Sequence, residues 1–246
     1  MDFKINHFDT IDSTNTYLYE LGRNGAEEGT VVISDYQSAG RGRSGRCFES
    51  PNGNLYMSLL IRPEIKADML HLLTPMCAVC VVNAIYDVLK IKCYIKWVND
   101  IYYNNKKVCG ILTELGMKSD IVDFAVIGIG INVFYREFEG ELIKTAGSLL
   151  NMSESANYLN KDELTDSLSK AILINFDRLY KAYNIHDFMN DYRCYSFVIG
   201  RKVTYYTESE SKEVTVIDIS DDGSLVVKDI EGNIKSYSDG EIRIKI

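Results

Sequence analysis

Apolar residues recur at every second position in several segments before residue 200, and this spacing predicts strands. Leu55, Met57, Leu59 and Ile61 share one face, so residues 54–62 are predicted to form a half-buried strand. Short apolar or β-branched runs predict further strands at residues 30–33, 94–98, 101–103, 107–115 and 121–133. Asn104-Asn105 is expected to turn the chain between two of these strands, which makes them a hairpin.

Helices are predicted in four places between these strands. Ser13 can cap a helix that reaches residue 19 or 21 and ends at Gly22. Thr74-Pro75 is typical of a helix start, and this helix is expected to run to residue 89. A third helix begins with the capping-box pair Asn160 and Glu163, and a fourth covers residues 185–195. The third carries an apolar stripe at helical spacing: Leu164, Leu168, Ile172, Leu179 and Tyr183.

The composition changes after Gly200, where Phe, Trp, Cys and Pro are absent through Ile246. Turn sequences at 221–223, 231–233 and 239–240 (Asp239-Gly240) separate short strands, and five strands in so short a segment predict a small β-barrel. The chain is therefore expected to contain an α/β catalytic domain over residues 1–196 and a small all-β domain over residues 197–246.

Composition narrows the possible functions. With 27 basic and 35 acidic residues, the net charge is −8, which disfavours general affinity for DNA or membranes. The first ten residues lack an apolar leader, and the apolar runs at 76–82 and 124–131 fall short of the roughly 18 residues that a membrane span requires. A soluble, cytoplasmic protein is expected. Cys77 and Cys80 lie within an apolar run and are interpreted as buried structural thiols.

The segment from Gln37 to Arg46 carries the densest chemical signal. Arg41, Arg43 and Arg46 are separated by glycines, which allow a ligand to approach the backbone, while guanidinium groups match the oxygens of carboxylates and phosphates. We interpret the segment as an anion site, mobile until an anion relieves the repulsion between its charges. The alternatives are a solvated loop or an RNA-binding segment, although such segments are usually repetitive.

Two further polar clusters occur at the ends of predicted strands. Lys96-Trp97-Val98-Asn99-Asp100 ends in a carboxylate that could hold a divalent cation, orient a cation or take a proton; a plain turn is equally consistent with it. Lys107 opens an apolar strand and is expected to point into a cleft, whereas Lys106 better fits an exposed edge.

Gly128, Gly130 and Asn132 fall on one face of a predicted strand, with Ile127, Ile129 and Ile131 on the opposite face. Two missing side chains beside an amide would make a shelf for a flat ligand; close packing of strands is the alternative. The spacing does not match a dinucleotide fingerprint, because no third glycine or helix follows.

Taken in order along the chain, these segments resemble the biotin protein ligase family. The resemblance rests on five segments: Ser13-Thr14-Asn15, Gly40–Arg46, Lys96–Asp100, Lys107–Gly110 and Gly128–Asn132. It implies a mixed-sheet catalytic domain of the biotin/lipoate ligase type, followed by a small SH3-like β-barrel. Repressor members carry a winged helix before the Ser-Thr-Asn segment. Twelve residues precede Ser13 here, so a short form that does not bind DNA is expected.

The resemblance also implies a two-step reaction. Biotin and ATP, with Mg²⁺, form biotinyl-5′-AMP, and a lysine of a biotin carboxyl carrier protein then takes the biotinyl group. The carrier would belong to acetyl-CoA carboxylase or another biotin-dependent carboxylase.

The resemblance assigns roles to individual residues. Arg41, Arg43 and Lys107 would neutralise the carboxylate and the α-phosphate. Asp100 would steer and deprotonate the acceptor lysine, or bind magnesium. The biotin-binding set is Ser13, Thr14, Asn15, Gln37, Arg41, Gly42, Arg43, Lys107 and Gly110. The nucleotide set is Arg43, Arg46 for the departing phosphates, Phe48 as a lid over adenine, Asn99 and Asn132.

Two positions depart from the family pattern: Val98 stands where proline is usual, and Phe48 stands where tryptophan is frequent. A lipoate-type ligase and a non-enzymatic nucleic-acid binder remain as alternative functions. A biotin-sensing regulator is disfavoured because the DNA-binding segment is missing. The sequence leaves open whether the protein forms a homodimer.

Overall fold

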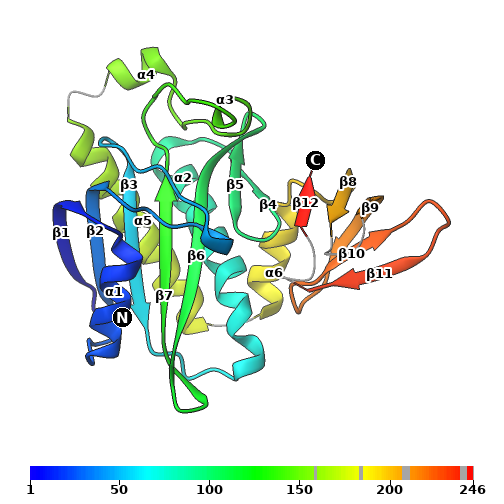
Figure 1. Ribbon diagram of the computed structural model, residues 1–246, viewed down its shortest axis with the longest axis horizontal. Coiled ribbons are helices and arrows are strands. Elements are labelled where there is room, and N and C mark those ends of the chain that lie inside the picture. Colours follow the sequence, from blue (N-terminus) through cyan, green and yellow to red (C-terminus); the bar gives the residue numbers. More distant parts are fainter. Residues whose placement is uncertain (158–159, 183–184, 207–210, 239–242, 246) are drawn as a thin grey trace.

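The computed structural model describes residues 1–157, 160–182, 185–206, 211–238 and 243–245, which form two sheets and their covering helices (Figure 1). The larger sheet has seven strands in the order β1-β2-β3-β7-β6-β5-β4, and the smaller has five in the order β11-β10-β9-β8-β12. The strands of the larger sheet are β1 (Lys4–Ile11), β2 (Thr30–Gln37), β3 (Leu55–Ile61), β4 (Tyr94–Lys96), β5 (Asp100–Tyr103), β6 (Lys106–Lys118) and β7 (Ile121–Ile131). The helices are α1 (Thr14–Arg23), α2 (Leu73–Leu89), α3 (Leu142–Thr145), α4 (Met152–Ala156), α5 (Lys161–Ala182) and α6 (Ile185–Cys194), with 3₁₀ turns at Arg43–Gly45 and Ala67–Leu72.

The larger sheet is mixed, as predicted, because β1 runs parallel to β2 while the other neighbours are antiparallel. The sequence analysis did not predict β1. Most side chains of β1 are exposed. Because the strand has no buried face, its sequence lacks the alternation of apolar and polar residues that identified the other strands. Backbone pairing with β2, from Lys4 opposite Thr30 to Ile11 opposite Gln37, holds it at the edge of the sheet. The predicted strand at 94–98 ends earlier, at Lys96.

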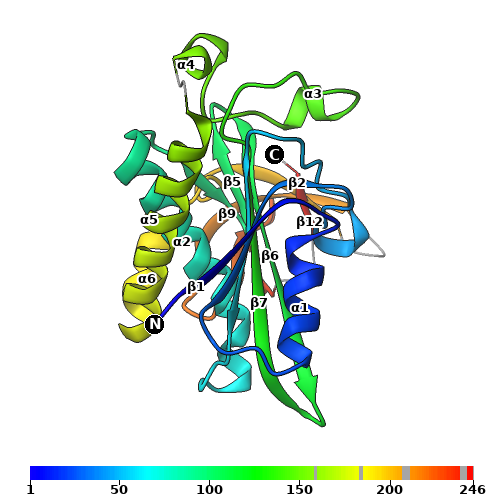
Figure 2. The ribbon, with the colours of Figure 1, turned by 90° about the vertical axis from the view of Figure 1, so that its left-hand side faces the viewer.

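Helices cover both faces of the larger sheet. Figure 2 shows α1 on one face and α2, α5 and α6 on the other. Alternate side chains of the central strands divide accordingly: Val31 and Ile33 enter the main core beside α2, whereas Val32 joins a second cluster beneath α1. Phe124 of β7 also lies in that second cluster. Because both faces of the sheet are covered, every residue of β3 is buried, and the prediction that this strand is half-buried is wrong.

Helix α1 begins as predicted and ends differently. The Ser13 side chain accepts a hydrogen bond from the Thr16 backbone amide at 3.4 Å, which confirms the cap. The predicted stop at Gly22 is wrong, because the helix continues to Arg23. A β-carbon on Gly22 would lie 2.7 Å from the Phe124 ring. Gly22 therefore allows the helix to pack closely on the sheet, and it does not end the helix.

Helix α2 is the core helix of the protein. The helical stretch Asp68–Leu89 is long and apolar enough to span a membrane by length and composition, with a mean hydropathy of 1.8 in its most apolar window. In the folded protein 67% of that window is buried, and α2 packs against the sheet and against α5 and α6. Cys77 and Cys80 are fully buried in this helix, which confirms the structural interpretation.

Burial predicts which cysteines react with alkylating agents. All six cysteines lie in the described residues and are unpaired, but Cys47 and Cys194 alone among them are exposed. Burial raises the pKa of Cys93 to about 12 and also raises that of Cys80. Because the thiolate is the nucleophile, iodoacetamide at pH 8 should modify Cys47 and Cys194 in the native protein, and all six cysteines in urea. Mass spectrometry can count the adducts; modification of Cys80 at the rate of Cys47 would contradict the packing of α2.

The C-terminal segment forms the five predicted strands: β8 (Lys202–Tyr206), β9 (Ser211–Ile219), β10 (Leu225–Lys228), β11 (Ile234–Tyr237) and β12 (Arg243–Lys245). Their buried side chains join the main core without a break. Hydrogen bonds also cross to this segment, among them those from Trp97 Nε1 to the carbonyl of Gly223 at 2.9 Å and from Arg193 Nη1 to that of Ile219 at 3.0 Å. The division at residue 196 and the closure into an SH3-like barrel stay predictions. The expected stripe residue Tyr183 and the turn Asp239-Gly240 lie outside the described residues.

Candidate active site

A cavity of about 450 Å³ lies where the arginine-rich loop, the start of α1, the β5–β6 hairpin and the end of β7 meet. Its size suits a small-molecule ligand. Every residue that the sequence analysis selected lines it: Ser13, Thr14, Asn15, Gln37, Arg41, Gly42, Arg43, Arg46, Phe48, Asn99, Asp100, Lys107, Gly110 and Asn132. Segments far apart in the sequence therefore form a single site.

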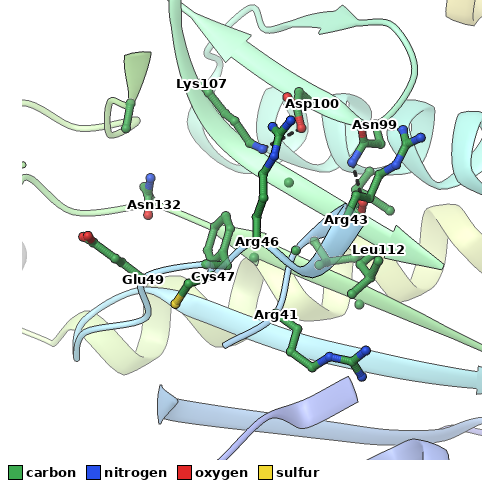
Figure 3. Close-up of a pocket in the computed structure, with 18 of the residues that line it drawn as sticks. Arg41, Arg43, Arg46, Cys47, Glu49, Asn99, Asp100, Lys107, Leu112 and Asn132 are labelled. Atoms are coloured by element: carbon green, nitrogen blue, oxygen red, sulfur yellow. Dashed lines mark hydrogen bonds and ion pairs between the residues drawn. The ribbon is translucent and has the colours of Figure 1, made fainter. Parts of the chain in front are cut away.

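One end of the cavity is cationic. Lys107 Nζ lies 2.6 Å from Asp100 Oδ1, and Arg43 Nη1 donates to Asn99 Oδ1 at 3.1 Å. Figure 3 shows these four side chains on the same side of the site, with Arg46 extending from the loop toward them. Burial lowers the pKa of Lys96, which also lines the cavity; Asp100 opposes this effect, while Lys107 and Arg46 add to it. Several cations thus surround one carboxylate, and the excess positive charge favours the binding of an anion.

The β5–β6 hairpin aims Lys107 into the cavity, as predicted. Asn104 and Asn105 adopt positive φ angles of 48° and 60° at its turn, which confirms the turn that the sequence indicated. Lys106 behaves differently from its neighbour: its ammonium donates to the carbonyls of Ile143 and Lys144 at 2.8 and 2.7 Å. The expectation of an exposed edge residue was therefore incomplete, because Lys106 binds the end of α3.

The turn that carries Asn99 and Asp100 is held by buried contacts. The Tyr192 hydroxyl donates to the Val98 carbonyl at 2.9 Å, and the Asn99 side chain donates to the Ile111 carbonyl at 2.7 Å. The Trp97–Val98 peptide bond is cis. These contacts fix the position of Asn99 and Asp100, although residue 98 is valine and not the proline that is usual in the family.

The other end of the cavity is polar and largely uncharged. The Gln37 side-chain oxygen accepts hydrogen bonds from the Thr14 amide at 2.9 Å and from its hydroxyl at 3.1 Å. The Ser58 hydroxyl donates to Asn15 Oδ1 at 2.6 Å and lies 2.8 Å from Thr14 Oγ1. Gln37 in turn donates to Ser50 at 2.8 Å. Side chains from α1, β2 and β3 are therefore fixed relative to one another before any ligand binds.

The glycine shelf predicted on β7 exists, but the protein's own side chains cover it. A β-carbon on Gly128 would lie 2.1 Å from Asn15 Oδ1, and one on Gly130 would lie 2.6 Å from the Phe48 ring. Phe48 also approaches Gly110 and meets Tyr56 edge to face, with ring centroids 6.3 Å apart. The two glycines therefore make room for Asn15 and Phe48, and those side chains line the cavity together with the glycine backbone.

Gly128→Ala tests this packing. The added methyl group would displace Asn15 and break its hydrogen bond to Ser58. The substitution is expected to lower the free energy of unfolding by about 1–3 kcal/mol, as at other overpacked sites. The variant should also bind a ligand at the polar end of the cavity at least about tenfold more weakly. Thermal unfolding and calorimetric titration measure the two effects. Unchanged affinity would show that the position of Asn15 does not matter for binding.

Buried polar groups mark a third part of the cavity, at the end of β7. Asn132 Nδ2 donates to the Gly147 carbonyl at 3.1 Å, while its Oδ1 is buried without a hydrogen-bond partner. Arg136 pairs with Glu49 at 3.0 Å, yet its Nε is also buried and unpartnered. An acceptor and a donor without partners at a cavity wall suit a ligand that carries both.

Three residues that shape the site were not predicted from the sequence: Ser58, Glu114 and Arg136. Ser58 is a polar residue in an otherwise apolar strand, and that signal could have identified it. Glu114 sits on β6 and binds Arg41, with 2.9 Å between Nη2 and Oε1. Within the described residues no group of three His, Cys, Asp or Glu side chains could hold a metal.

Comparison with known proteins accounts for this combination of fold and cavity. Residues 7–132 match the biotin/lipoate A/B protein ligase family, and residues 198–244 match the biotin protein ligase C-terminal domain. The chain belongs to the biotin/lipoate A/B protein ligase family. The C-terminal match distinguishes it as a biotin protein ligase within that family.

Relatives and solved structures of biotin protein ligases support the assignment. The chain is 37% identical over 240 residues to the bifunctional ligase/repressor BirA of Bacillus subtilis, covering 94% of this chain and 71% of that protein. It is 27% identical to the biotin–[acetyl-CoA-carboxylase] ligase of Paracoccus denitrificans, covering 88% and 91% of the two chains. The biotin protein ligase of Aquifex aeolicus in complex with biotin and ATP superposes with a TM-score of 0.82 at 28% identity and covers 98% of each chain.

Proposed function

We propose that the protein activates biotin with ATP and transfers the biotinyl group to a lysine of a biotin carboxyl carrier protein. The observation that carries the proposal is the division of one cavity into a cationic end, at Arg43 and Lys107, and an uncharged polar end, at Thr14 and Gln37. Biotin has the same division, with a carboxylate at one end and a neutral ureido ring at the other. The relatives' names support the same reaction.

In the first step a biotin carboxylate oxygen attacks the α-phosphorus of ATP, the bond from that phosphorus to the bridging oxygen breaks, and pyrophosphate leaves. The two reactants are both anions, so their approach is opposed by charge repulsion. Lys107 and Arg43 offset this repulsion; a close opposite-charge contact is favourable by about 4 kcal/mol before desolvation at an effective dielectric of 20. Arg46 and Lys96 also line the cavity and would receive the departing phosphates.

In the second step the acceptor lysine attacks the acyl carbon, the acyl–oxygen bond breaks, and AMP leaves. The amine must first lose a proton, because at an ordinary pKa near 10.4 it is almost wholly charged at neutral pH. Asp100 lies at the cationic end of the cavity, 2.6 Å from Lys107. We assign it to attract the incoming ammonium and to accept its proton.

The adenine ring is assigned to the end of β7. The unpartnered Oδ1 of Asn132 can accept a hydrogen bond from an exocyclic amine, and the Phe48 ring can stack on the base. Phe48 lacks the indole donor that tryptophan would supply.

Magnesium fits as a companion of the nucleotide rather than as a resident ion. The described residues place one carboxylate, Asp100, beside the cationic end and no three-ligand cluster. Mg²⁺ commonly takes one or two carboxylates and completes its shell with phosphate oxygens and water. When bound, it would neutralise charge on the phosphates.

The free state of all six cysteines suits a reducing compartment, and we place the reaction in the cytoplasm. The experiment that tests the function incubates the protein with ATP, a carrier domain and either biotin or lipoate. Biotin-dependent AMP release and biotinylation of the carrier are expected. Labelling by lipoate alone would identify a lipoate-type ligase, and binding of nucleic acid without any AMP release would identify the non-enzymatic alternative.

A further inference from the structure

Glu114 joins two walls of the cavity. Its carboxylate binds the Arg41 guanidinium through both oxygens, at 2.9 Å from Nη2 to Oε1 and 3.2 Å from Nη1 to Oε2. The same Oε2 accepts a hydrogen bond from Asn15 Nδ2 at 3.0 Å. Arg41 belongs to the arginine-rich loop and Asn15 to helix α1, so one side chain of β6 connects both segments. The Glu114 side chain is 21% exposed and that of Arg41 48%, so the ion pair is partly open to solvent, whereas Asn15 on the other side of Glu114 is buried.

The contact with Glu114 turns Arg41 away from the cationic end. Figure 3 shows its guanidinium pointing away from Lys107, Asp100 and Arg43. Two parallel N–H···O bonds between a guanidinium and a carboxylate give a geometrically specific and comparatively strong pair. The terminal nitrogens of Arg41 are therefore engaged by the protein and not directed at the place where two anions would meet.

Asn15 depends on the same carboxylate. Its amide protons are taken by Glu114 and by the Leu112 carbonyl, at 3.0 and 3.3 Å, and its Oδ1 accepts from Ser58. The residue is 4% exposed and packs directly over Gly128. Through Ser58 and Thr14 the network continues to Gln37, so the position of Asn15 affects the whole polar end of the cavity.

We propose that Glu114 is a positioning residue for biotin, and that Arg41 acts as a strut that ties the arginine-rich loop to α1 rather than as a ligand of the reacting anions. The inference rests on the proposed function, because it assigns the polar end to the ureido ring. Loss of Glu114 releases the loop and removes an acceptor of Asn15. Loss of Arg41 releases the loop and leaves an unpaired carboxylate beside Asn15.

The test is a double-mutant cycle with Arg41→Gln, Glu114→Gln and the double variant. Each single variant is expected to raise the Kd and KM for biotin about tenfold, the effect of roughly 1.4 kcal/mol, while the KM for ATP stays within about twofold of wild type. The double variant should be no worse than Arg41→Gln. The exchange Arg41→Glu with Glu114→Arg should recover part of the affinity. Thermal unfolding checks that each variant is folded.

Glu20 and Arg23 provide the matched control, since they form an exposed pair on α1 outside the cavity, and Glu20→Gln and Arg23→Gln should leave the KM for biotin unchanged. The proposal is overturned if Glu114→Gln retains wild-type affinity while Arg41→Gln loses it, or if the two losses multiply in the double variant. Either result would make Arg41 a substrate ligand. A wild-type protein that forms no biotin-dependent adenylate would instead refute the proposed function; the coupling of residues 41 and 114 would then still be measured by thermal unfolding.

Discussion

Replacement of Lys107 by methionine is expected to lower the rate of biotinyl-adenylate formation at least about a hundredfold, the usual effect of removing a group that stabilises transition-state charge. Methionine keeps the length of the side chain and removes its charge. The variant would remove the ammonium that lies 2.6 Å from Asp100, in the place where two further anions must approach. Biotin-dependent exchange between pyrophosphate and ATP measures this step without a carrier protein.

Lys106→Met is the matched control for this variant. Lys106 neighbours Lys107 in the sequence, but it contacts the carbonyls at the end of α3 and does not line the cavity. Its loss should cost some stability and leave the exchange rate within a few-fold of wild type. Equal losses in both variants would mean that the hairpin matters structurally and that the charge of Lys107 has no special role.

Arg43→Ala is expected to slow adenylate formation by a similar factor and to weaken retention of the adenylate. Arg43 reaches the cationic end from the loop, on the side where it contacts Asn99 at 3.1 Å. A guanidinium in this position can bind two oxygens of the acyl phosphate at once, which an ammonium cannot. Single-turnover assays measure formation, and the dissociation of labelled biotinyl-AMP measures retention.

The control for charge alone is Arg23→Ala, at an exposed arginine of α1 whose side chain is 63% exposed. Its exchange rate and adenylate retention should equal those of the wild type. Wild-type formation and retention in Arg43→Ala would remove Arg43 from the proposed mechanism and leave the charge compensation to Lys107.

The sequence predicted most of the site because the relevant signals are local. Glycines alternating with arginines, a lysine at the start of an apolar strand, and two glycines with an asparagine on one strand face are each visible within ten residues. Alternation also predicted β3, although not its burial: the strand was expected to be half-buried, and all its residues are buried because helices cover both faces of the sheet. In these segments the residue types and their spacing are sufficient to predict the strand and the polar side chains that it carries.

The missing parts depend on contacts between distant segments. β1 is defined by backbone pairing with β2, which no side-chain pattern records. The pairing of Glu114 with Arg41 joins residues 73 positions apart, and a charged residue in a partly buried strand gives no local sign of its partner. The seating of Phe48 on Gly130 requires the arginine-rich loop to fold back over β7, which the spacing of residues along the chain cannot show.

We propose that Arg43 and Lys107 bring a carboxylate and a phosphate together in one cavity, and a crystal structure with biotinyl-5′-AMP would show whether they do. We expect the acyl phosphate within hydrogen-bonding distance of Arg43 and Lys107, the ureido ring beside Thr14 and Gln37, and the adenine beside Asn132. An acyl phosphate bound away from both cations, with the two side chains in their present contacts with Asn99 and Asp100, would contradict it.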